Sequence, residues 1–144
     1  MRKPVVFINE PMDKNGESHR LLEAADIKVR LGRSSREHPG WVYTDEELIE
    51  LCQDVDAVLG GSRERYTARF MEACPRLRMI SKVGIGTERI DVEAATRLGI
   101  AVGHTPVPEN YDSVAEFTIA AMLSLVKRLD DAQEHVRRQR WRDD

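Results

Sequence analysis

Residues 79–129 read MISKVGIGTERIDVEAATRLGIAVGHTPVPENYDSVAEFTIAAMLSLVKRL, and the rest of the chain is organised around this stretch. It contains a glycine loop, Val83-Gly84-Ile85-Gly86-Thr87, directly after an apolar run of strand length. It also contains a helix that we expect to begin at Ser113, because Ser113 and Glu116 have the spacing of a capping box. Between the two, residues 105–110 form a proline-containing turn at which the chain should leave its sheet. The stretch therefore joins a loop that can hold an anion to a helix that needs a partner.

Short apolar runs alternate with helical patterns along the first part of the chain. The expected strands are residues 5–8, 27–31, 57–59, 79–83 and 100–102, and the expected helices are residues 17–25, a helix opened by a capping box at Thr44 and Glu47, residues 67–74 and residues 92–98. Parallel strands need helix-length connections, so this order predicts parallel pairing. We expect an α/β fold, a flavodoxin-like doubly wound five-stranded parallel sheet with helices on both faces and a protruding C-terminal linker helix.

Ligands bind at the carboxyl ends of the strands in such sheets. Here that edge would carry Asn9–Asp13, Gly61–Arg65, Val83–Thr87 and His104–Asn110. Glycines in the loop would let consecutive backbone N–H groups face one anion, and Arg63 could bind a carboxylate or phosphate with its guanidinium fork. The simpler alternatives are a tight turn without a ligand, a solvated Arg63, and a His104 that only satisfies loop backbone.

Several chemistries find no support in the sequence. A dinucleotide fingerprint would need a third glycine where Arg89 stands and an acidic residue near positions 104–106, which read HTP. The histidines are scattered without ligand spacing, so no metal site is predicted. A nucleophile elbow of the form Gly-x-Ser-x-Gly is also missing.

The composition is that of an ordinary globular chain, with 41% hydrophobic and 33% charged residues. A net charge of −3 gives no electrostatic footprint for nucleic acid, and no apolar run approaches the ~20 residues of a membrane span. Cys52 and Cys74 have no partner spacing, which favours a reducing compartment. We expect a cytoplasmic protein that binds neither nucleic acid nor membranes.

The character of the chain changes after Asn110. From Val114 to Val126 the polar residues are Glu116, Thr118 and Ser124, so this helix is apolar nearly all round and should be covered from more than one side. We therefore predict a homodimer through the helix 113–129. From Lys127 the pattern becomes charged and indicates a linker. The predicted domains are residues 1–110 and an interdomain or dimerisation helix with its linker over residues 111–144.

The motifs of the central stretch resemble those of the NAD-dependent D-2-hydroxyacid dehydrogenases, and of the D-3-phosphoglycerate dehydrogenases among them. The matching residues are Val83-Gly84-Ile85-Gly86-Thr87-Glu88-Arg89-Ile90-Asp91, Glu93-Ala94-Ala95-Thr96, Gly99-Ile100, Thr105-Pro106, Asn110 and Ser113-Val114-Ala115-Glu116. The resemblance implies an oxidoreductase of two domains, in which a flavodoxin-like substrate domain precedes a Rossmann domain that binds NAD.

Carried over position by position, the resemblance implies residues that bind a small 2-hydroxy or 2-oxo acid: Ser62, Arg63, Val83, Gly84, Ile85 and Asn110. In this set the backbone of the loop would contact the substrate carboxylate, and Ile85 would also contact the cofactor. Ser62 and Arg63 would border the pocket, and Asn110 would face the reacting centre.

The sequence departs from the family pattern in one large respect. The glycine fingerprint of the Rossmann domain, its acidic ribose ligand, and the catalytic arginine, glutamate and histidine have no counterpart in these 144 residues. We therefore predict no catalytic residue, expect no NAD to bind this chain, and expect no hydride transfer by the chain alone. It is interpreted as the substrate domain of such a dehydrogenase; the alternative is a stand-alone, non-catalytic module for small-carboxylate binding or dimerisation.

Overall fold

The computed structural model describes residues 2–13, 15–34 and 36–138. The chain divides into two compact units, Met1–Pro106 and Val107–Asp144. The division falls just after the fifth strand, four residues before the predicted boundary at residue 110. Each unit is described by itself below.

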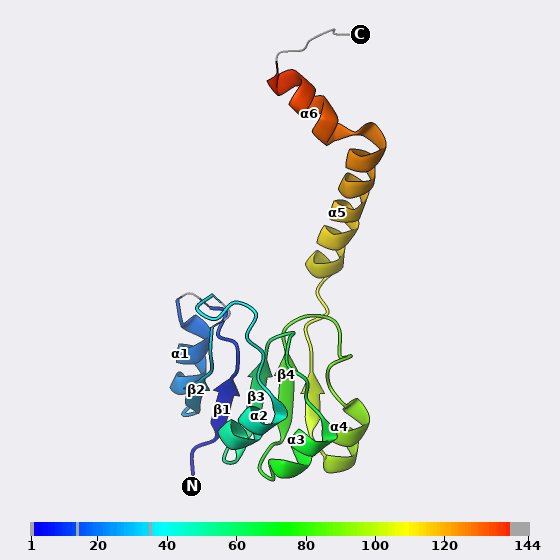
Figure 1. Ribbon diagram of the computed structural model, residues 1–144. Helices are drawn as coiled ribbons and strands as arrows, with labels where there is room; N and C mark the ends of the chain where they lie inside the picture. Colours follow the sequence, from blue (N-terminus) through cyan, green and yellow to red (C-terminus); the bar gives the residue numbers. More distant parts are fainter. Residues whose placement is uncertain (1, 14, 35, 139–144) are drawn as a thin grey trace. The chain divides into compact units, whose positions relative to one another are not determined.

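The first unit is built on a five-stranded sheet of order β2-β1-β3-β4-β5 in which every neighbouring pair is parallel (Figure 1). Its strands are β1 (Val5–Ile8), β2 (Lys28–Leu31), β3 (Ala57–Gly60), β4 (Met79–Lys82) and β5 (Ala101–Gly103). This strand order confirms the predicted flavodoxin-like topology. No end of a predicted strand differs from the observed end by more than one residue.

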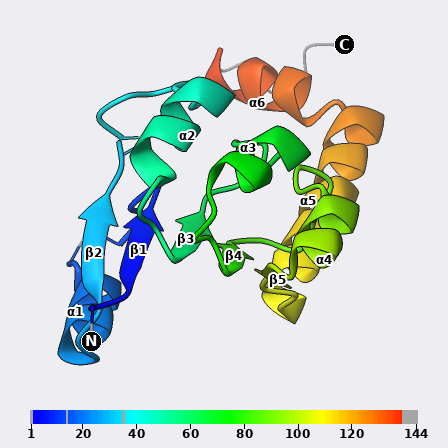
Figure 2. The same ribbon diagram turned by 90° about the horizontal axis from the view of Figure 1, so that it is seen from below.

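Four helices connect these strands: α1 (Glu17–Ala24), α2 (Asp45–Cys52), α3 (Ala68–Ala73) and α4 (Val92–Leu98). Viewed along the sheet, α2, α3 and α4 lie on one face and α1 lies on the other, beside β1 and β2 (Figure 2). The local chemistry explains their bounds. The predicted capping box opens α2, where Thr44 Oγ1 accepts the Glu47 N–H and a Glu47 carboxylate oxygen accepts the Thr44 N–H. Gly99 ends α4 in the left-handed conformation, at φ 69°.

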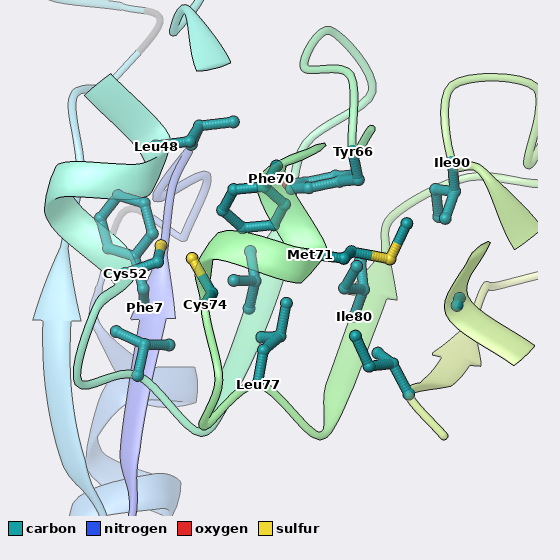
Figure 3. Close-up of a cluster of buried hydrophobic side chains, with 14 of the residues drawn as sticks. Phe7, Leu48, Cys52, Tyr66, Phe70, Met71, Cys74, Leu77, Ile80 and Ile90 are labelled. Carbon is teal, nitrogen blue, oxygen red and sulfur yellow. The ribbon is translucent and has the colours of Figure 1, made fainter. Parts of the chain in front are cut away.

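The core lies between the sheet and the layer of α2, α3 and α4 (Figure 3). Phe7 and Ile80 point into it from the sheet and are completely buried, as is Phe70 of α3. The two cysteines belong to this core and both are reduced. Burial raises the pKa of Cys52 to about 12 and that of Cys74 to about 11. Both therefore stay protonated at neutral pH and act as small apolar side chains.

The second unit differs from the prediction at both ends of its long helix. α5 spans Pro108–Lys127, so it begins five residues before Ser113, and the predicted capping box is wrong. Proline at the first helical position has a preset φ and lacks only an N–H that would be unpaired there, which explains the earlier start. Ser113 instead donates its hydroxyl to Glu109 O at 2.7 Å, inside the helix.

The predicted linker after Lys127 also contains a helix. α6 spans Leu129–Arg137, and Arg128 separates it from α5 in a left-handed conformation at φ 50°. The residues beyond 138, including the rest of the charged tail, lie outside the described residues. In the described part of the chain, no helix is long and apolar enough to cross a membrane.

The amino end of the sheet is fixed by Asp56, and this generates a stability prediction. Its carboxylate accepts the Val5 N–H at 2.8 Å, Arg76 Nη2 at 3.1 Å and Arg2 Nη2 at 2.5 Å. Burial alone would raise the pKa of Asp56, but the Val5 N–H and the two guanidinium groups outweigh it, and the pKa is lowered. Asp56→Asn should therefore lower the free energy of unfolding by about 1–3 kcal/mol at pH 7, because it removes charge-assisted hydrogen bonds.

Urea unfolding as a function of pH checks this prediction. A carboxyl whose pKa is lowered in the folded state stabilises the fold above its unfolded pKa of about 3.9 and loses that contribution as the pH falls through the folded value. The difference between wild type and Asp56→Asn should therefore shrink below about pH 4. Glu72→Gln, which breaks an exposed pair with Arg97, is the matched control and should change stability by about 0.5 kcal/mol or less. Equal losses in the two variants would contradict the prediction.

Candidate functional site

The ends of three strands are tied together at the carboxyl edge of the sheet. Gly60 and Lys82 are partners in the β3–β4 register, and the Val83 N–H donates to Gly60 O at 3.0 Å. Asn9, which follows β1 and is completely buried, accepts the Gly61 N–H on its side-chain oxygen at 2.9 Å. The loop after β4 is therefore held against the ends of β1 and β3, as the parallel topology predicts.

Three consecutive carbonyls of the glycine loop bind groups of the same unit. Gly84 O accepts the Thr105 N–H at 3.0 Å. Ile85 O lies 2.8 Å from His104 Nδ1, and Gly86 O accepts from Lys82 Nζ at 2.6 Å. A carbonyl can only accept, so His104 carries its proton on Nδ1. The expectation that His104 satisfies loop backbone is confirmed.

These three bonds decide where the next three N–H groups point. In a planar trans peptide the carbonyl of one residue is antiparallel to the N–H of the next residue. Since the carbonyls of residues 84, 85 and 86 face their partners, the N–H groups of Ile85, Gly86 and Thr87 face away from them. Among the described residues, none of these three N–H groups donates a hydrogen bond. Consecutive N–H groups without a partner are donors that an anion can use where they converge.

The first two N–H groups of the predicted loop are already used. The Val83 N–H donates to Gly60 O, and the Gly84 N–H donates to Thr105 Oγ1 at 2.8 Å. The donors open to a ligand are therefore displaced along the loop from the predicted set, toward Gly86 and Thr87. Periodicity and motif could not show this, because it depends on bonds to residues about twenty positions away.

Lys82 is a member of this site that the sequence analysis missed. Its side chain is only 4% exposed, and besides Gly86 O it faces Glu88, with Nζ 3.7 Å from Oε1. The Glu88 N–H and the Lys82 ammonium hold the pKa of Glu88 below its ordinary value, so Glu88 is ionised at neutral pH. The alternation along β4 contained the signal, since Lys82 shares its face of the strand with the completely buried Ile80.

The other predicted residues lie in two different places. Ser62 and Arg63 follow β3, next to the glycine loop in the sheet order; Ser62 is exposed and Arg63 is half-buried. Arg63 Nη1 is buried and has no hydrogen-bond partner in the part of the chain that the structure describes. Its carbonyl accepts from Arg89 Nη1 at 3.1 Å. Asn110 lies in the first turn of α5 and belongs to the second unit.

A cavity of about 210 Å³ opens at this edge within the first unit. Its lining combines strand ends, the loop and the segment after β1: Ile8, Glu10, Met12, Asp13, Leu59, Gly60, Ser81, Lys82, Val83 and Thr105. The cavity has room for a molecule of a few heavy atoms. Lys82 is the basic residue of its lining.

The described residues do not fit the phosphates of a dinucleotide. Arg89, at the place of a third glycine, uses its guanidinium to bind Arg63 O. The N-terminus of α4 is capped by Asp91, whose carboxylate accepts the Ala94 N–H at 2.9 Å and would repel a pyrophosphate. Among the described residues there is also no group of three or more His, Cys, Asp or Glu side chains that could hold a metal ion.

Comparison with known proteins identifies relatives over almost the whole chain. Residues 6–139 match the family model described as D-isomer specific 2-hydroxyacid dehydrogenase, catalytic domain. A glyoxylate reductase from Thermofilum pendens is 33% identical over 141 residues, which cover 98% of this chain and 39% of that relative. A D-3-phosphoglycerate dehydrogenase from Methanocaldococcus jannaschii is 36% identical over 136 residues, 94% of this chain and 24% of that relative.

The fold is also found among solved structures. This chain superposes on the D-lactate dehydrogenase from Aquifex aeolicus with a TM-score of 0.70, at 23% identity and over 97% of this chain. That structure was solved in complex with NAD and lactic acid. This chain matches 39% of that structure. The chain thus spans less than half the length of the proteins it matches.

The backbone of the loop gives a prediction that needs no ligand. Gly84 has φ 108°, and a Cβ built on it would meet nothing within 4 Å. Gly84→Ala should therefore lower the free energy of unfolding by about 1–3 kcal/mol through backbone strain alone. Gly86→Ala is the matched control: its Cβ would meet the carboxylate end of Glu88, an exposed side chain that can turn away.

Chemical denaturation of both variants would test this. We expect a loss for Gly86→Ala of at most about 0.5 kcal/mol, as is usual where no special backbone conformation is involved. A Gly84→Ala variant as stable as wild type would show that the positive φ is not required.

Proposed function

Because the chain belongs to the D-isomer specific 2-hydroxyacid dehydrogenase family, we propose that it is the substrate domain of an NAD-dependent D-2-hydroxyacid dehydrogenase. In this function it binds the carboxylate of a small 2-hydroxy or 2-oxo acid for hydride transfer between that acid and NAD. The observation that carries the proposal is the row of open N–H groups at Ile85, Gly86 and Thr87, at the edge of the sheet where this topology places ligands.

A carboxylate suits this loop because each of its oxygens can accept more than one hydrogen bond. Fixed N–H groups bind the anion without reorganising, so the acid is oriented as well as held. In the proposal the Ile85 N–H donates a hydrogen bond to the carboxylate of the acid. The side chain of Ile85, which is 39% exposed, is the predicted cofactor contact. Val83 and Gly84 then support the loop with bonds that are already made, rather than contacting the acid with their N–H groups.

Ser62, Arg63 and Asn110 complete the proposed substrate contacts. The unpartnered, buried Nη1 of Arg63 supports a role for this residue, because a guanidinium group is costly to bury without an acceptor. Asn110 belongs to the second unit, and its place facing the reacting centre stays a prediction of the family resemblance.

We also propose that two copies of the chain form a homodimer through α5. Within the second unit α5 has no buried residue, and Phe117, Ile119 and Leu123 are 74%, 60% and 53% exposed. Fully burying side chains of this kind contributes roughly 1.5–3 kcal/mol each, so pairing of two helices is favoured. Twofold association is the commonest arrangement of identical chains.

Carboxylate binding can be tested with the 144-residue chain by following backbone amide resonances while adding glyoxylate or glycerate. The largest shifts should fall on Ile85, Gly86 and Thr87. Each charge-assisted hydrogen bond contributes about 1.5–3 kcal/mol before immobilisation costs, so a millimolar dissociation constant is expected. The uncharged amide of glycerate is the matched control and should leave these resonances unchanged. Shifts confined to other regions would reject the loop as the carboxylate site.

Association through α5 is tested by the double substitution Ile119→Glu with Leu123→Glu. Carboxylates on this helix should convert the dimer into a soluble monomer and leave the sheet intact, which sedimentation and circular dichroism would report. Unfolding of the first unit by the same changes would mean that the helix packs on its own sheet instead. A wild-type chain that sediments as a monomer at high micromolar concentration would refute the dimer.

A further inference from the structure

Lys82 occupies a position that would ordinarily hold an apolar residue. It ends β4 on the face that Ile80 uses to enter the core, and its side chain is only 4% exposed. Burying an ammonium group is unfavourable unless it is paired and hydrogen-bonded, and here its charge partner is an exposed carboxylate 3.7 Å away. Stability alone therefore does not account for a lysine here, and residues that break such a local rule tend to mark functional positions.

Lys82 contacts the glycine loop and Glu88, which follows the loop directly. Nζ donates to Gly86 O at 2.6 Å, the tightest of the three carbonyl contacts in the loop, and balances its charge against Glu88, whose side chain is 71% exposed. Because the ammonium group is buried, it does not present a free charge to solvent.

We infer that Lys82 is a positioning residue for carboxylate recognition: it fixes the Gly86–Thr87 peptide plane so that the Thr87 N–H points out of the loop. The antiparallel arrangement of C=O and N–H in this peptide couples the two ends of the bond. Without Lys82, Gly86 O would be free to turn toward water, and the Thr87 N–H would turn with it. This inference rests on the proposed function of the loop.

His104 and Thr105 hold the two preceding peptides in the same way, but from the segment after β5 rather than from β4. Lys82 is therefore the residue that fixes the last of the three N–H groups independently of that neighbouring strand. Its removal should affect Thr87 most, Gly86 less and Ile85 least. This gradient distinguishes positioning by Lys82 from a general loosening of the loop, which would affect all three N–H groups alike.

The test compares Lys82→Met with Lys82→Arg and Lys3→Met. Methionine keeps the apolar stem and removes the donor, whereas arginine keeps a donor on a longer side chain. Lys3 pairs with Asp26 at the other end of the sheet, so Lys3→Met removes the same charge far from the loop. For each variant we would measure the global stability by urea unfolding, the amide shifts and hydrogen exchange of residues 85–87 without ligand, and the affinity for glycerate.

Lys82→Met should show altered shifts and faster exchange at Thr87, and bind glycerate about five- to tenfold more weakly, as expected when one charge-assisted contact loses its alignment. Lys82→Arg should recover part of the affinity, and Lys3→Met should bind like wild type. A Lys82→Met chain with wild-type shifts at Thr87 and wild-type affinity would overturn the inference. So would a loss of affinity that Lys3→Met reproduces.

Two further outcomes remain decisive. If Lys82→Met does not fold, the lysine is required for the fold and not only for positioning. Lys82→Arg then provides the test. Unchanged amide shifts of residues 85–87 together with weaker glycerate binding in that variant would overturn the inference. If wild type binds no carboxylate, the proposed function fails. The ligand-free measurements at Thr87 then still show whether Lys82 fixes the peptide plane, and unchanged shifts in Lys82→Met would reject it.

Discussion

The planarity of the trans peptide bond is the constraint on which the loop after β4 depends. Three carbonyls in a row are bound by side chains and backbone of the same unit, so the three following N–H groups face the other way. No glycine fingerprint or helix N-terminus is needed for this arrangement. The anchors come from the ends of two adjacent parallel strands, and the sheet topology brings them together. The site is therefore a consequence of the fold as much as of the loop sequence.

The difference between local signals and contacts made by the sheet topology explains which parts of the fold the sequence could predict. Strand and helix positions follow from local periodicity and caps, and parallel pairing follows from the helix-length connections between the strands. The start of α5 was mispredicted because two local signals compete there, Pro108 and the Ser113–Glu116 spacing. Proline decides the start, since its ring already has the φ of a helix and its missing N–H costs nothing in the first turn.

The candidate site was predictable to the level of its loop and no further. The sequence places Val83–Thr87 at the ligand edge, because the carboxyl ends of parallel strands share one edge. It does not show which N–H groups are already used, since that depends on Gly60 and Thr105, which are distant in sequence. Lys82 was missed for a related reason. A lysine at a strand end is usually exposed, so the period-two alternation that places Lys82 on the face of Ile80 is easily set aside for this residue type.

The charges around the loop indicate how much of the recognition this unit can supply. Its buried cation, Lys82, is committed to Gly86 O and to Glu88, so a bound carboxylate would meet neutral N–H groups with an ionised Glu88 close by. Neutral donors orient an anion well but offset little of its desolvation. Tight binding then requires a positive charge that is not already paired. In the neighbouring loop, Arg63 has a buried Nη1 without a hydrogen-bond partner among the described residues, and this is the reason for proposing it as a contact of the acid.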